Sequence, residues 1–305
     1  MASPTRTPDA PFGRMLTAMV TPFTADGALD YDGAQQLAAY LVDEQRNDGL
    51  IVSGTTGESP VTSDEEKERL LRAVVEAVGE RATVVAGAGT YDTHHSVELA
   101  RRSERAGAHG LLLVTPYYSK PPQEGVYRHF TAIADATGLP VMLYDIPGRT
   151  GTPIATETLI RLAQHERVVA VKDAKGDLFA GSQVMTATDL VYYSGDDTLN
   201  LPWLSVGGAG FVSVIGHVAG AVLARMIERH RAGDPAGALA LYRQVLPVVD
   251  GIMMRAGGAI MSKAALGLVG RPVGPVRPPL VGATQEQIAE LRACLVAGGV
   301  KLSDT

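Results

Sequence analysis

Short apolar runs recur along the chain, and longer segments with many polar residues separate them. Most of the runs are rich in valine and leucine and have the length of a single strand. Continuous apolar runs of this kind are typical of parallel strands that are covered on both faces. The pattern predicts eight strands, over residues 15–20, 50–52, 83–86, 111–114, 141–144, 168–171, 190–193 and 211–215.

Helix signals fill most of the segments between these strands. Ser63 is followed three residues later by Glu66, which is the capping-box pattern, and a helical apolar repeat comes next. Asp92 and Thr93 open a second helix that ends near Gly107. Alternating strands and helices with short links imply parallel strands, and eight such units favour a closed (β/α)8 barrel, the TIM barrel.

An open, doubly wound sheet is the main alternative to the barrel. Its dinucleotide-binding version needs a G-x-G-x-x-G segment directly after the first strand. In this chain Gly87-Ala88-Gly89 follows the third predicted strand, and the final glycine is missing. The sequence therefore favours the barrel.

The C-terminal part of the chain shows helical patterns and no further strand. Asp234 followed by Pro235 is a typical helix start, and Pro247 is expected to kink or interrupt that helix. Further helices are predicted over 259–269 and from a capping box at Thr284. We divide the chain into a flexible lead-in (1–11), a (β/α)8 barrel (12–232) and a C-terminal helical extension (233–305).

Composition narrows the class of protein. A net charge of −6 and a pI near 5.7 argue against nucleic-acid and anionic-membrane partners. No apolar run approaches the ~20 residues of a membrane span, and the N-terminus lacks a signal-peptide core. Cys294 is the one cysteine, which fits a reducing compartment, and the seven histidines form no HExxH motif. We expect a cytoplasmic protein without a metal or cofactor.

Lys172 directly follows the sixth predicted strand and ends its apolar run. If the strand alternates, Val168, Ala170 and Lys172 share one face, and Val169 and Val171 share the other. On the face toward the barrel interior, Lys172 would lose hydration and its pKa would fall, so that neutral amine becomes available to form a Schiff base with a carbonyl. The alternative is a lysine that extends its charge to solvent.

Polar segments follow several of the other strands, at the end of the barrel that carries active sites. These segments are 54–59, 115–118, 144–149 and 195–197. Tyr144 shares a strand face with Met142, so its hydroxyl could project inward beside Lys172 and move protons. The paired threonines in 54–59 offer hydroxyl and N–H groups to a carboxylate, and Arg149 offers a bidentate guanidinium.

Each of these features has a structural alternative. The segment 54–57 could be a tight turn, Tyr117 and Tyr118 an interface pair, and Arg149 half of an ion pair. Asp196 and Asp197 are assigned to capping of their loop. The functional interpretation rests on the occurrence of all these segments at one predicted rim.

Five motifs together resemble the dihydrodipicolinate synthase family. They are GTTGES at 54–59, VTPYYSKP at 114–121, YDIPGRTG at 144–151, VVAVKDAKGD at 168–177 and SGDD at 194–197. The resemblance extends over roughly residues 12–300. It implies a pyruvate-dependent class I aldolase that condenses pyruvate with L-aspartate 4-semialdehyde, the first committed step of lysine and diaminopimelate synthesis.

The resemblance also implies catalytic roles for individual residues. Lys172 would form the Schiff base with pyruvate, and Tyr144 would donate and accept protons. Thr55 and Tyr118 would complete a proton relay, with Tyr118 reaching in from a neighbouring subunit. The family implies a homotetramer, built as a dimer of dimers.

Four further residues are assigned to substrate binding. Thr56 would hold the pyruvate carboxylate, and Val212 would contact pyruvate through its backbone. Arg149 would receive the carboxylate of the semialdehyde. Gly195, after the seventh predicted strand, completes the predicted binding set.

The lysine-inhibition site of the family is only partly matched. Ser59 and Tyr117 fit it. Lysine-sensitive relatives carry histidines, an asparagine and a glutamate at four positions that are occupied here by Asp64, Lys67, Tyr91 and His95. Lys67 would place a like charge near the inhibitor's ammonium group, so we expect little inhibition by L-lysine.

Two other functions remain open at this point. A sibling lyase acting on N-acetylneuraminate or a 2-keto-3-deoxy sugar acid would share the lysine and the tyrosine. Arg149 and the second threonine of GTTGE favour the synthase. A non-catalytic, ligand-sensing barrel is the alternative from another class, and the intact set of Lys172, Tyr144, Thr55 and Tyr118 argues against it.

Overall fold

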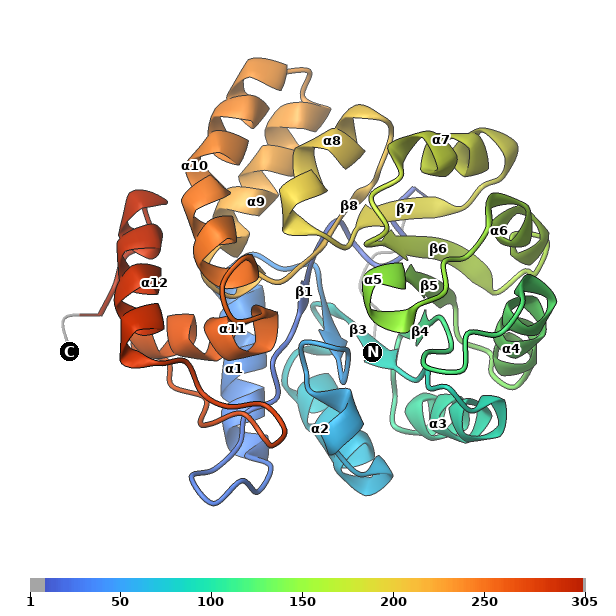
Figure 1. Ribbon diagram of the computed structural model, residues 1–305, viewed down its shortest axis with the longest axis horizontal. Coiled ribbons are helices and arrows are strands. Elements are labelled where there is room, and N and C mark those ends of the chain that lie inside the picture. Colours follow the sequence, from blue (N-terminus) through green and yellow to red (C-terminus); the bar gives the residue numbers. More distant parts are fainter. Residues whose placement is uncertain (1–8, 304–305) are drawn as a thin grey trace.

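The computed structural model describes residues 9–303, and within that range eight parallel strands close into a barrel (Figure 1). The strands pair in chain order, and β1 pairs with both β2 and β8. They are β1 (Met15–Ala18), β2 (Gly49–Val52), β3 (Thr83–Gly87), β4 (Gly110–Val114), β5 (Val141–Asp145), β6 (Val168–Asp173), β7 (Val191–Ser194) and β8 (Gly210–Ser213). The predicted barrel is confirmed, and the open sheet is wrong. Residues 1–8 of the predicted lead-in lie outside the described residues.

Helices surround the barrel on its outer side (Figure 1). They are α1 (Tyr31–Asp43), α2 (Asp64–Val78), α3 (Thr93–Arg105), α4 (Gln123–Asp135), α6 (Thr156–Leu162), α7 (Leu178–Ala187), α8 (Asn200–Ser205) and α9 (Gly216–Arg231). Short turns η1 (Ser59–Val61), α5 (Pro147–Thr150) and η2 (Asp197–Leu199) lie in loops that follow strands. The capping box at the start of α2 is confirmed, because the Ser63 and Glu66 side chains each accept the other's backbone N–H.

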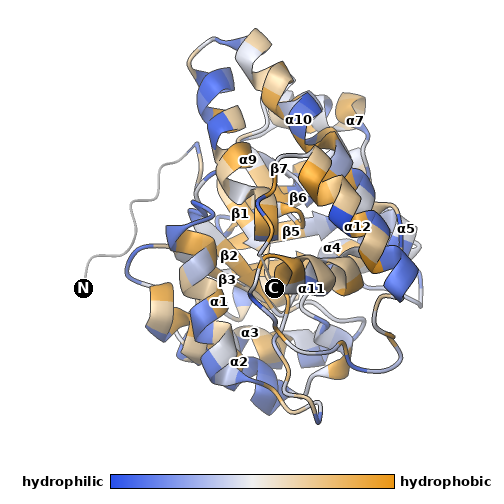
Figure 2. Cartoon of the chain, turned by 90° about the vertical axis from the view of Figure 1, so that its left-hand side faces the viewer, coloured by the Kyte–Doolittle hydropathy of each residue, from blue (hydrophilic) through white to orange (hydrophobic). Residues whose placement is uncertain are grey.

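Two apolar layers hold the barrel together. The larger layer lies between strands and helices, and it accounts for the hydrophobic inner faces of the helices in Figure 2. The smaller layer fills the barrel interior with residues that include Phe12, Leu16, Ile51, Val85, Leu112, Met142, Ala170 and Tyr193. Strands covered on both faces explain why the sequence shows continuous apolar runs rather than alternation.

A bulge where β5 meets β6 changes the predicted faces of the sixth strand. Val141 pairs with Val168, but Met142 pairs with Ala170, so Val169 is an extra residue. Val168 therefore packs in the outer layer, and Val169 contacts the inner one. The predicted alternation is wrong for these two valines. Beyond the bulge it holds, and Lys172 lies on the interior face.

The extension consists of α10 (Pro235–Met253), α11 (Gly258–Leu268) and α12 (Gln285–Ala297) (Figure 1). Helices α10 and α11 contact α9, and α12 packs on α10 and α11. An apolar cluster joins the extension to the barrel and contains Phe211, Ile227, Val248 and Leu291. The division of the chain at residue 232 stays a prediction.

Pro247 does not interrupt α10, which runs unbroken from Pro235 to Met253. The expectation of an interruption is wrong, and the alternative, a kink, stays a prediction. Pro247 leaves the carbonyl of Arg243 without a helical donor, but Arg243 is exposed, so water can satisfy that carbonyl. Within the described residues, no single helix is long and apolar enough to cross a membrane. The pair α10 and α11 reaches that length and hydropathy only when taken together, and the two helices are bent by 114° relative to each other.

Candidate active site

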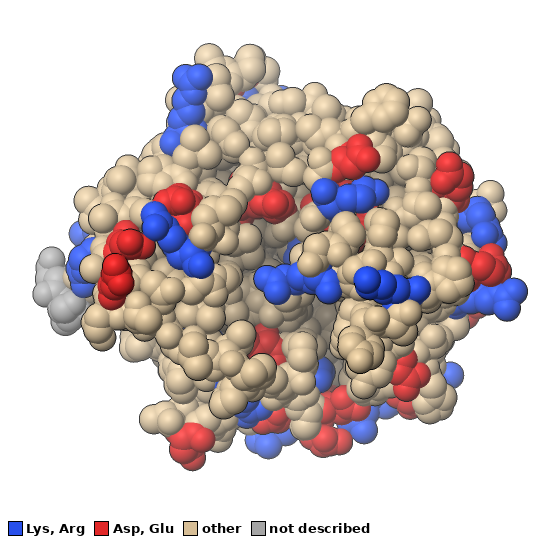
Figure 3. Space-filling model, in the orientation of Figure 1, with Lys and Arg blue, Asp and Glu red and all other residues tan. Residues whose placement is uncertain are grey.

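A cavity of about 200 Å³ opens at the carboxyl ends of the strands. This face of the molecule is hollowed near its centre, with basic side chains beside the hollow (Figure 3). The cavity is lined by six of the eight residues selected from the sequence: Thr55, Thr56, Tyr144, Arg149, Lys172 and Gly195. The extension contributes Met253, Ala256–Ile260 and Leu280 to the same lining, which the sequence did not indicate.

Lys172 lies at the end of β6 with 4% of its surface exposed. Burial lowers the pKa of Lys172 to about 7, while the Asp197 carboxylate raises it and the Arg149 guanidinium lowers it further. Gly195 is needed beside this lysine, because a Cβ at that position would lie 2.8 Å from the Lys172 Cγ. A large fraction of the amine is therefore neutral near pH 7 and can act as a nucleophile.

Tyr144 lies directly opposite Lys172 in the β5–β6 ladder. The Lys172 Nζ is 4.0 Å from the centroid of the Tyr144 ring. Burial raises the pKa of Tyr144 to about 12, against the effects of a hydrogen bond with Thr55 and the charge of Arg149. The phenol is thus protonated at neutral pH and linked to a second hydroxyl, which suits it to pass a proton between groups.

The loop after β2 presents Thr55 and Thr56 in a tight turn. The Glu58 N–H donates to the Thr55 carbonyl at 3.1 Å, and the Ser59 N–H donates to the Gly54 carbonyl at 3.3 Å. Glu58 has a φ of 56°, in the left-handed region that residues other than glycine seldom adopt. Thr56 is buried at the cavity wall, and Thr55 is exposed.

The assignment of Asp197 to capping of its own loop is wrong, because its carboxylate binds residues that follow the loop. Its carboxylate accepts hydrogen bonds from Ser213 Oγ (2.6 Å), Val214 N (2.8 Å), Ile215 N (2.9 Å) and Asn200 Nδ2 (2.8 Å). The N–H groups of Val214 and Ile215 thus bond a side chain and not a neighbouring strand, and β8 ends at Ser213, not at Ile215 as predicted. Asp196, by contrast, caps η2 through the Thr198 N–H, as expected. Nothing in the linear pattern indicates that Asp197 is buried near Lys172.

An aspartate follows both Tyr144 and Lys172 in the sequence and lies on the opposite face of its strand. Asp145 and Asp173 pair with each other in the β5–β6 ladder. Lys175 Nζ lies 3.3 Å from Asp145 Oδ2, and the backbone N–H groups of Lys175 and Gly176 donate to Asp173 Oδ1 at 3.1 and 2.8 Å. This cluster ties together the ends of the strands that carry Tyr144 and Lys172, and we did not identify it from the sequence.

Two of the selected residues lie elsewhere. Tyr118 is 92% exposed, with a φ of 72°, and its ring projects from the loop after β4. The Val212 side chain is buried in the inner layer of the barrel, and Val214 lines the cavity instead.

A second cavity, of about 230 Å³, adjoins the first. The two cavities share Thr55, Tyr144, Ile146 and Arg149 as a common wall. Ser59, Pro60 and Tyr117 are among the residues that line only the second one. It is therefore a separate space that adjoins the first cavity at Tyr144 and Thr55.

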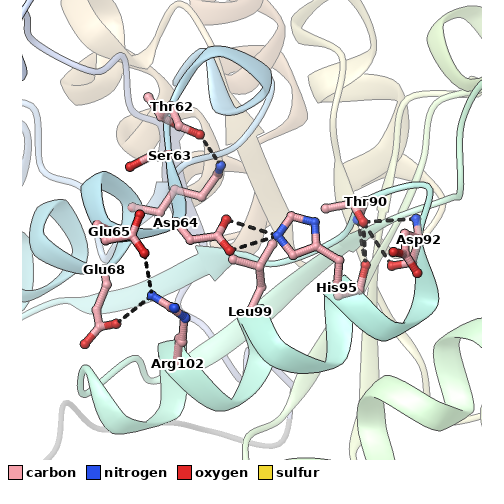
Figure 4. Close-up of polar contacts among 12 residues, drawn as sticks. Thr62, Ser63, Asp64, Glu65, Glu68, Thr90, Asp92, His95, Leu99 and Arg102 are labelled. Carbon is pink, nitrogen blue, oxygen red and sulfur yellow. Dashed lines mark hydrogen bonds and ion pairs between the residues drawn. The ribbon is translucent and has the colours of Figure 1, made fainter.

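Two of the four residues that differ from the lysine-inhibition pattern, Asp64 on α2 and His95 on α3, contact each other between these helices (Figure 4). His95 Nε2 lies 3.0 Å from both carboxylate oxygens of Asp64. The Lys67 ammonium donates to the Thr62 carbonyl at 2.6 Å. The ring of Tyr91 packs edge to face on that of Tyr117, with centroids 5.4 Å apart. These side chains bind one another or nearby backbone.

Within residues 9–303, no group of three or more histidine, cysteine, aspartate or glutamate side chains is arranged to hold a metal ion. The reactive groups of the cavity are an amine, hydroxyls and a guanidinium. They are suited to covalent attack on a carbonyl, to proton transfer and to the binding of carboxylates.

Comparison with known proteins identifies close relatives. The sequence model of the dihydrodipicolinate synthetase family matches residues 11–297. A Streptomyces coelicolor protein named 4-hydroxy-tetrahydrodipicolinate synthase 2 is 65% identical over 98% of this chain and 100% of its own length. An Acidothermus cellulolyticus 4-hydroxy-tetrahydrodipicolinate synthase is 67% identical, covering 95% and 94%. The crystal structure of the Cyanidioschyzon merolae enzyme with lysine bound superposes with a TM-score of 0.92 at 44% identity, covering 95% and 99%.

Proposed function

The chain belongs to the dihydrodipicolinate synthetase family, and on that premise we propose that it condenses pyruvate with L-aspartate 4-semialdehyde through a Schiff base at Lys172. Its activity is that of a 4-hydroxy-tetrahydrodipicolinate synthase, an enzyme of lysine biosynthesis. One observation carries the mechanism: Lys172 is buried in the cavity and opposite Tyr144, with a pKa lowered to about 7.

The first half of the reaction activates pyruvate. The neutral Lys172 amine attacks the keto carbon, and the oxygen leaves as water after it has received protons, which gives a protonated imine. The imine withdraws electrons from the methyl group, which loses a proton to become an enamine. Tyr144, hydrogen-bonded to Thr55, is placed to carry these protons.

The second half forms the new carbon–carbon bond. The enamine carbon attacks the aldehyde of the second substrate, and the aldehyde oxygen takes up a proton. The substrate's own amine then attacks the imine carbon and displaces Lys172, which closes the ring and frees the enzyme. Holding both reactants in one cavity turns these attacks into intramolecular steps.

The substrate carboxylates are assigned to two sides of the cavity. Thr56, with its hydroxyl and N–H, supports the pyruvate carboxylate, and Gly195 leaves space beside Lys172. Val212 stays in the proposal as a backbone contact, next to Val214 in the wall. Arg149 supports the semialdehyde carboxylate, because a guanidinium binds a carboxylate with two parallel hydrogen bonds. The names of the 65–67% identical relatives favour this synthase over the sibling lyases.

We propose a homotetramer in which Tyr118 completes the neighbour's site. Its ring projects from the chain, and the second cavity is lined by Tyr144 and Thr55. An aromatic side chain from a second copy would fill that space and extend the proton relay. We further propose that the enzyme works in the cytoplasm, where it needs neither a metal nor another cofactor.

Borohydride reduction in the presence of pyruvate tests the function. We expect one adduct per chain, located at Lys172 by peptide mass mapping. Lys175 and Lys263, which are also poorly exposed, serve as internal controls. An adduct at either of them, or none at all, would refute the mechanism. Turnover with aspartate semialdehyde, against N-acetylneuraminate, then separates the synthase from the lyase.

A further inference from the structure

A buried ion pair links the C-terminal extension to the loop that carries Thr55 and Thr56. Lys263 Nζ on α11 lies 2.8 Å from Glu58 Oε1, and the two side chains are 5% and 1% exposed. The same ammonium donates to the Pro275 carbonyl at 2.6 Å. A pair of this kind adds little net stability, because removing both charges from water offsets their attraction. Its contribution is therefore to the geometry of the residues that it joins.

The other oxygen of Glu58 is also held by the extension. Glu58 Oε2 accepts the backbone N–H of Arg277 at 2.8 Å. The Arg277 guanidinium donates to both carboxylate oxygens of Glu66 at 2.6 and 2.8 Å and to the Val61 carbonyl at 2.9 Å. The Glu58 carboxylate is therefore fixed from two sides by residues that lie more than two hundred positions later in the chain.

Glu58 in turn fixes the loop that carries Thr55 and Thr56. Its φ of 56° is a conformation that costs free energy for a residue with a Cβ, so the surrounding structure must hold it. Its backbone N–H bonds the Thr55 carbonyl, and Thr56 lies between the two. A rotation at Glu58 would therefore move the Thr55 hydroxyl away from Tyr144 and the Thr56 hydroxyl away from the cavity.

We propose that Glu58 and Lys263 are positioning residues, and that the extension uses their ion pair to hold Thr55 and Thr56 in the geometry the reaction needs. This inference rests on the proposed function. Neither side chain lines the cavity. The helix of Lys263 begins at Gly258, within the segment that does line it, so α11 contacts the active site both directly and through Glu58.

The proposal is tested by measuring kcat for each active site that is able to form the Lys172 adduct. Lys263→Met and Glu58→Gln remove one charge each, and the fraction of chains that form the Lys172 adduct with pyruvate counts the competent sites. We expect kcat per trapped site to fall roughly 10- to 100-fold in either variant, as small misplacements of reacting groups do. KM for pyruvate should rise, because Thr56 moves. The double variant should be no slower than the worse single variant, because the two residues act as one unit.

Arg271→Met is the matched control. Arg271 also joins the extension to the barrel, by an exposed ion pair with Glu44 directly after α1, but it has no link to the loop that carries Thr55 and Thr56. Its kcat per trapped site should equal that of the wild type.

Three outcomes separate the alternatives. A Lys263→Met variant within twofold of the wild type in kcat per trapped site would overturn the proposal, whatever its melting temperature. Effects that multiply in the double variant would also overturn it. If Lys263→Met does not fold, Lys263→Gln, which keeps a donor for Pro275, is measured against the same criterion. Absence of an adduct in the wild type would instead count against the proposed function.

Discussion

At the scale of single residues, the reactivity of Lys172 is set by its surroundings. Burial has the largest effect, and the Asp197 carboxylate and the Arg149 guanidinium act in opposite directions on the same ammonium group. Only the neutral amine attacks a carbonyl, so the rate of imine formation should follow the deprotonated fraction. The pH dependence of that step therefore reports on the groups around the lysine.

We expect the rate of pyruvate adduct formation to rise with pH through about 7 and then level off. In Arg149→Ala the midpoint should move to higher pH, because the charge that lowers the pKa is lost. Trapping by borohydride across the neutral range measures both midpoints. Turnover with the semialdehyde should fall further than trapping does. A midpoint that moves down, or equal losses in both assays, would contradict the assigned role of Arg149.

We expect Tyr144→Phe to fold normally and to lose roughly 10²- to 10⁴-fold in turnover, as is typical when a positioned acid–base group is removed. The physical reason is the loss of the hydroxyl bonded to Thr55 beside the Lys172 amine. Steady-state kinetics together with a thermal melt check this. Near-normal turnover would remove Tyr144 from proton transfer.

At the scale of elements, the ends of β5 and β6 form one unit. Their inner faces carry Tyr144 and Lys172, and their outer faces carry Asp145 and Asp173, with Lys175 next to both aspartates. Burial raises the pKa of Asp173 to about 6, against the backbone N–H bonds that it accepts. At neutral pH the structure that holds Tyr144 and Lys172 therefore contains the ionised carboxylate of Asp173, which burial disfavours.

This cost has a definite pH dependence. The folded chain binds the Asp173 proton more tightly than the unfolded chain does, so this group's stabilising contribution is present below about pH 4 and lost as pH rises through about 6. Asp173→Asn cannot ionise, and its Oδ1 can still accept from Lys175 and Gly176. Relative to the wild type, the variant should gain stability between pH 4 and 7, by roughly 3 kcal/mol at most.

Thermal melts at a series of pH values measure this difference. Asp189→Asn, at an exposed aspartate before β7, is the control and should follow the wild type at every pH. A variant of Asp173 whose melting temperature runs parallel to that of the wild type would mean that the carboxylate is not perturbed.

At the scale of the whole molecule, a single chain leaves two features without partners. Tyr118 projects from the rim, and the second cavity beside Tyr144 is open. If Tyr118 of one copy entered the second cavity of another copy, the ring would be covered and the cavity filled. Large exposed aromatic rings often anchor such interfaces.

We expect a homotetramer by light scattering. Tyr118→Phe should keep the assembly and lose turnover, because the ring remains and the hydroxyl does not. Tyr118→Ala should weaken both, while the Lys172 adduct with pyruvate still forms. An active monomer would refute the assembly, and normal turnover in Tyr118→Phe would refute the relay.

We also expect little inhibition by L-lysine. The Lys67 ammonium would repel that of the ligand, and His95 and Asp64 are already paired with each other. Initial rates over a range of L-lysine concentrations test this. Inhibition as strong as in sensitive relatives would show that the substituted residues rearrange to admit the ligand.

The linear pattern does not show how elements contact one another in the folded chain. Alternation predicts the inward face of Lys172 correctly, but it fails at Val168, because the bulge depends on how two strands meet. In the same way, the helix signals of α10 are correct, whereas the effect of Pro247 depends on its place in the fold, one turn after the exposed Arg243. Local signals thus identify elements, and their contacts decide the details.

The sequence by itself determined the barrel, its order of elements and the residues at its rim, because strand runs, caps and motifs are local and independent of distant contacts. Only the tertiary structure decided which charges lie near those residues. Asp197, Asp173 and the Glu58–Lys263 pair act across 25 to more than 200 positions, and the bulge and the shared cavity wall depend on packing. Burial and electrostatic coupling are properties of the folded chain, so no linear pattern records them.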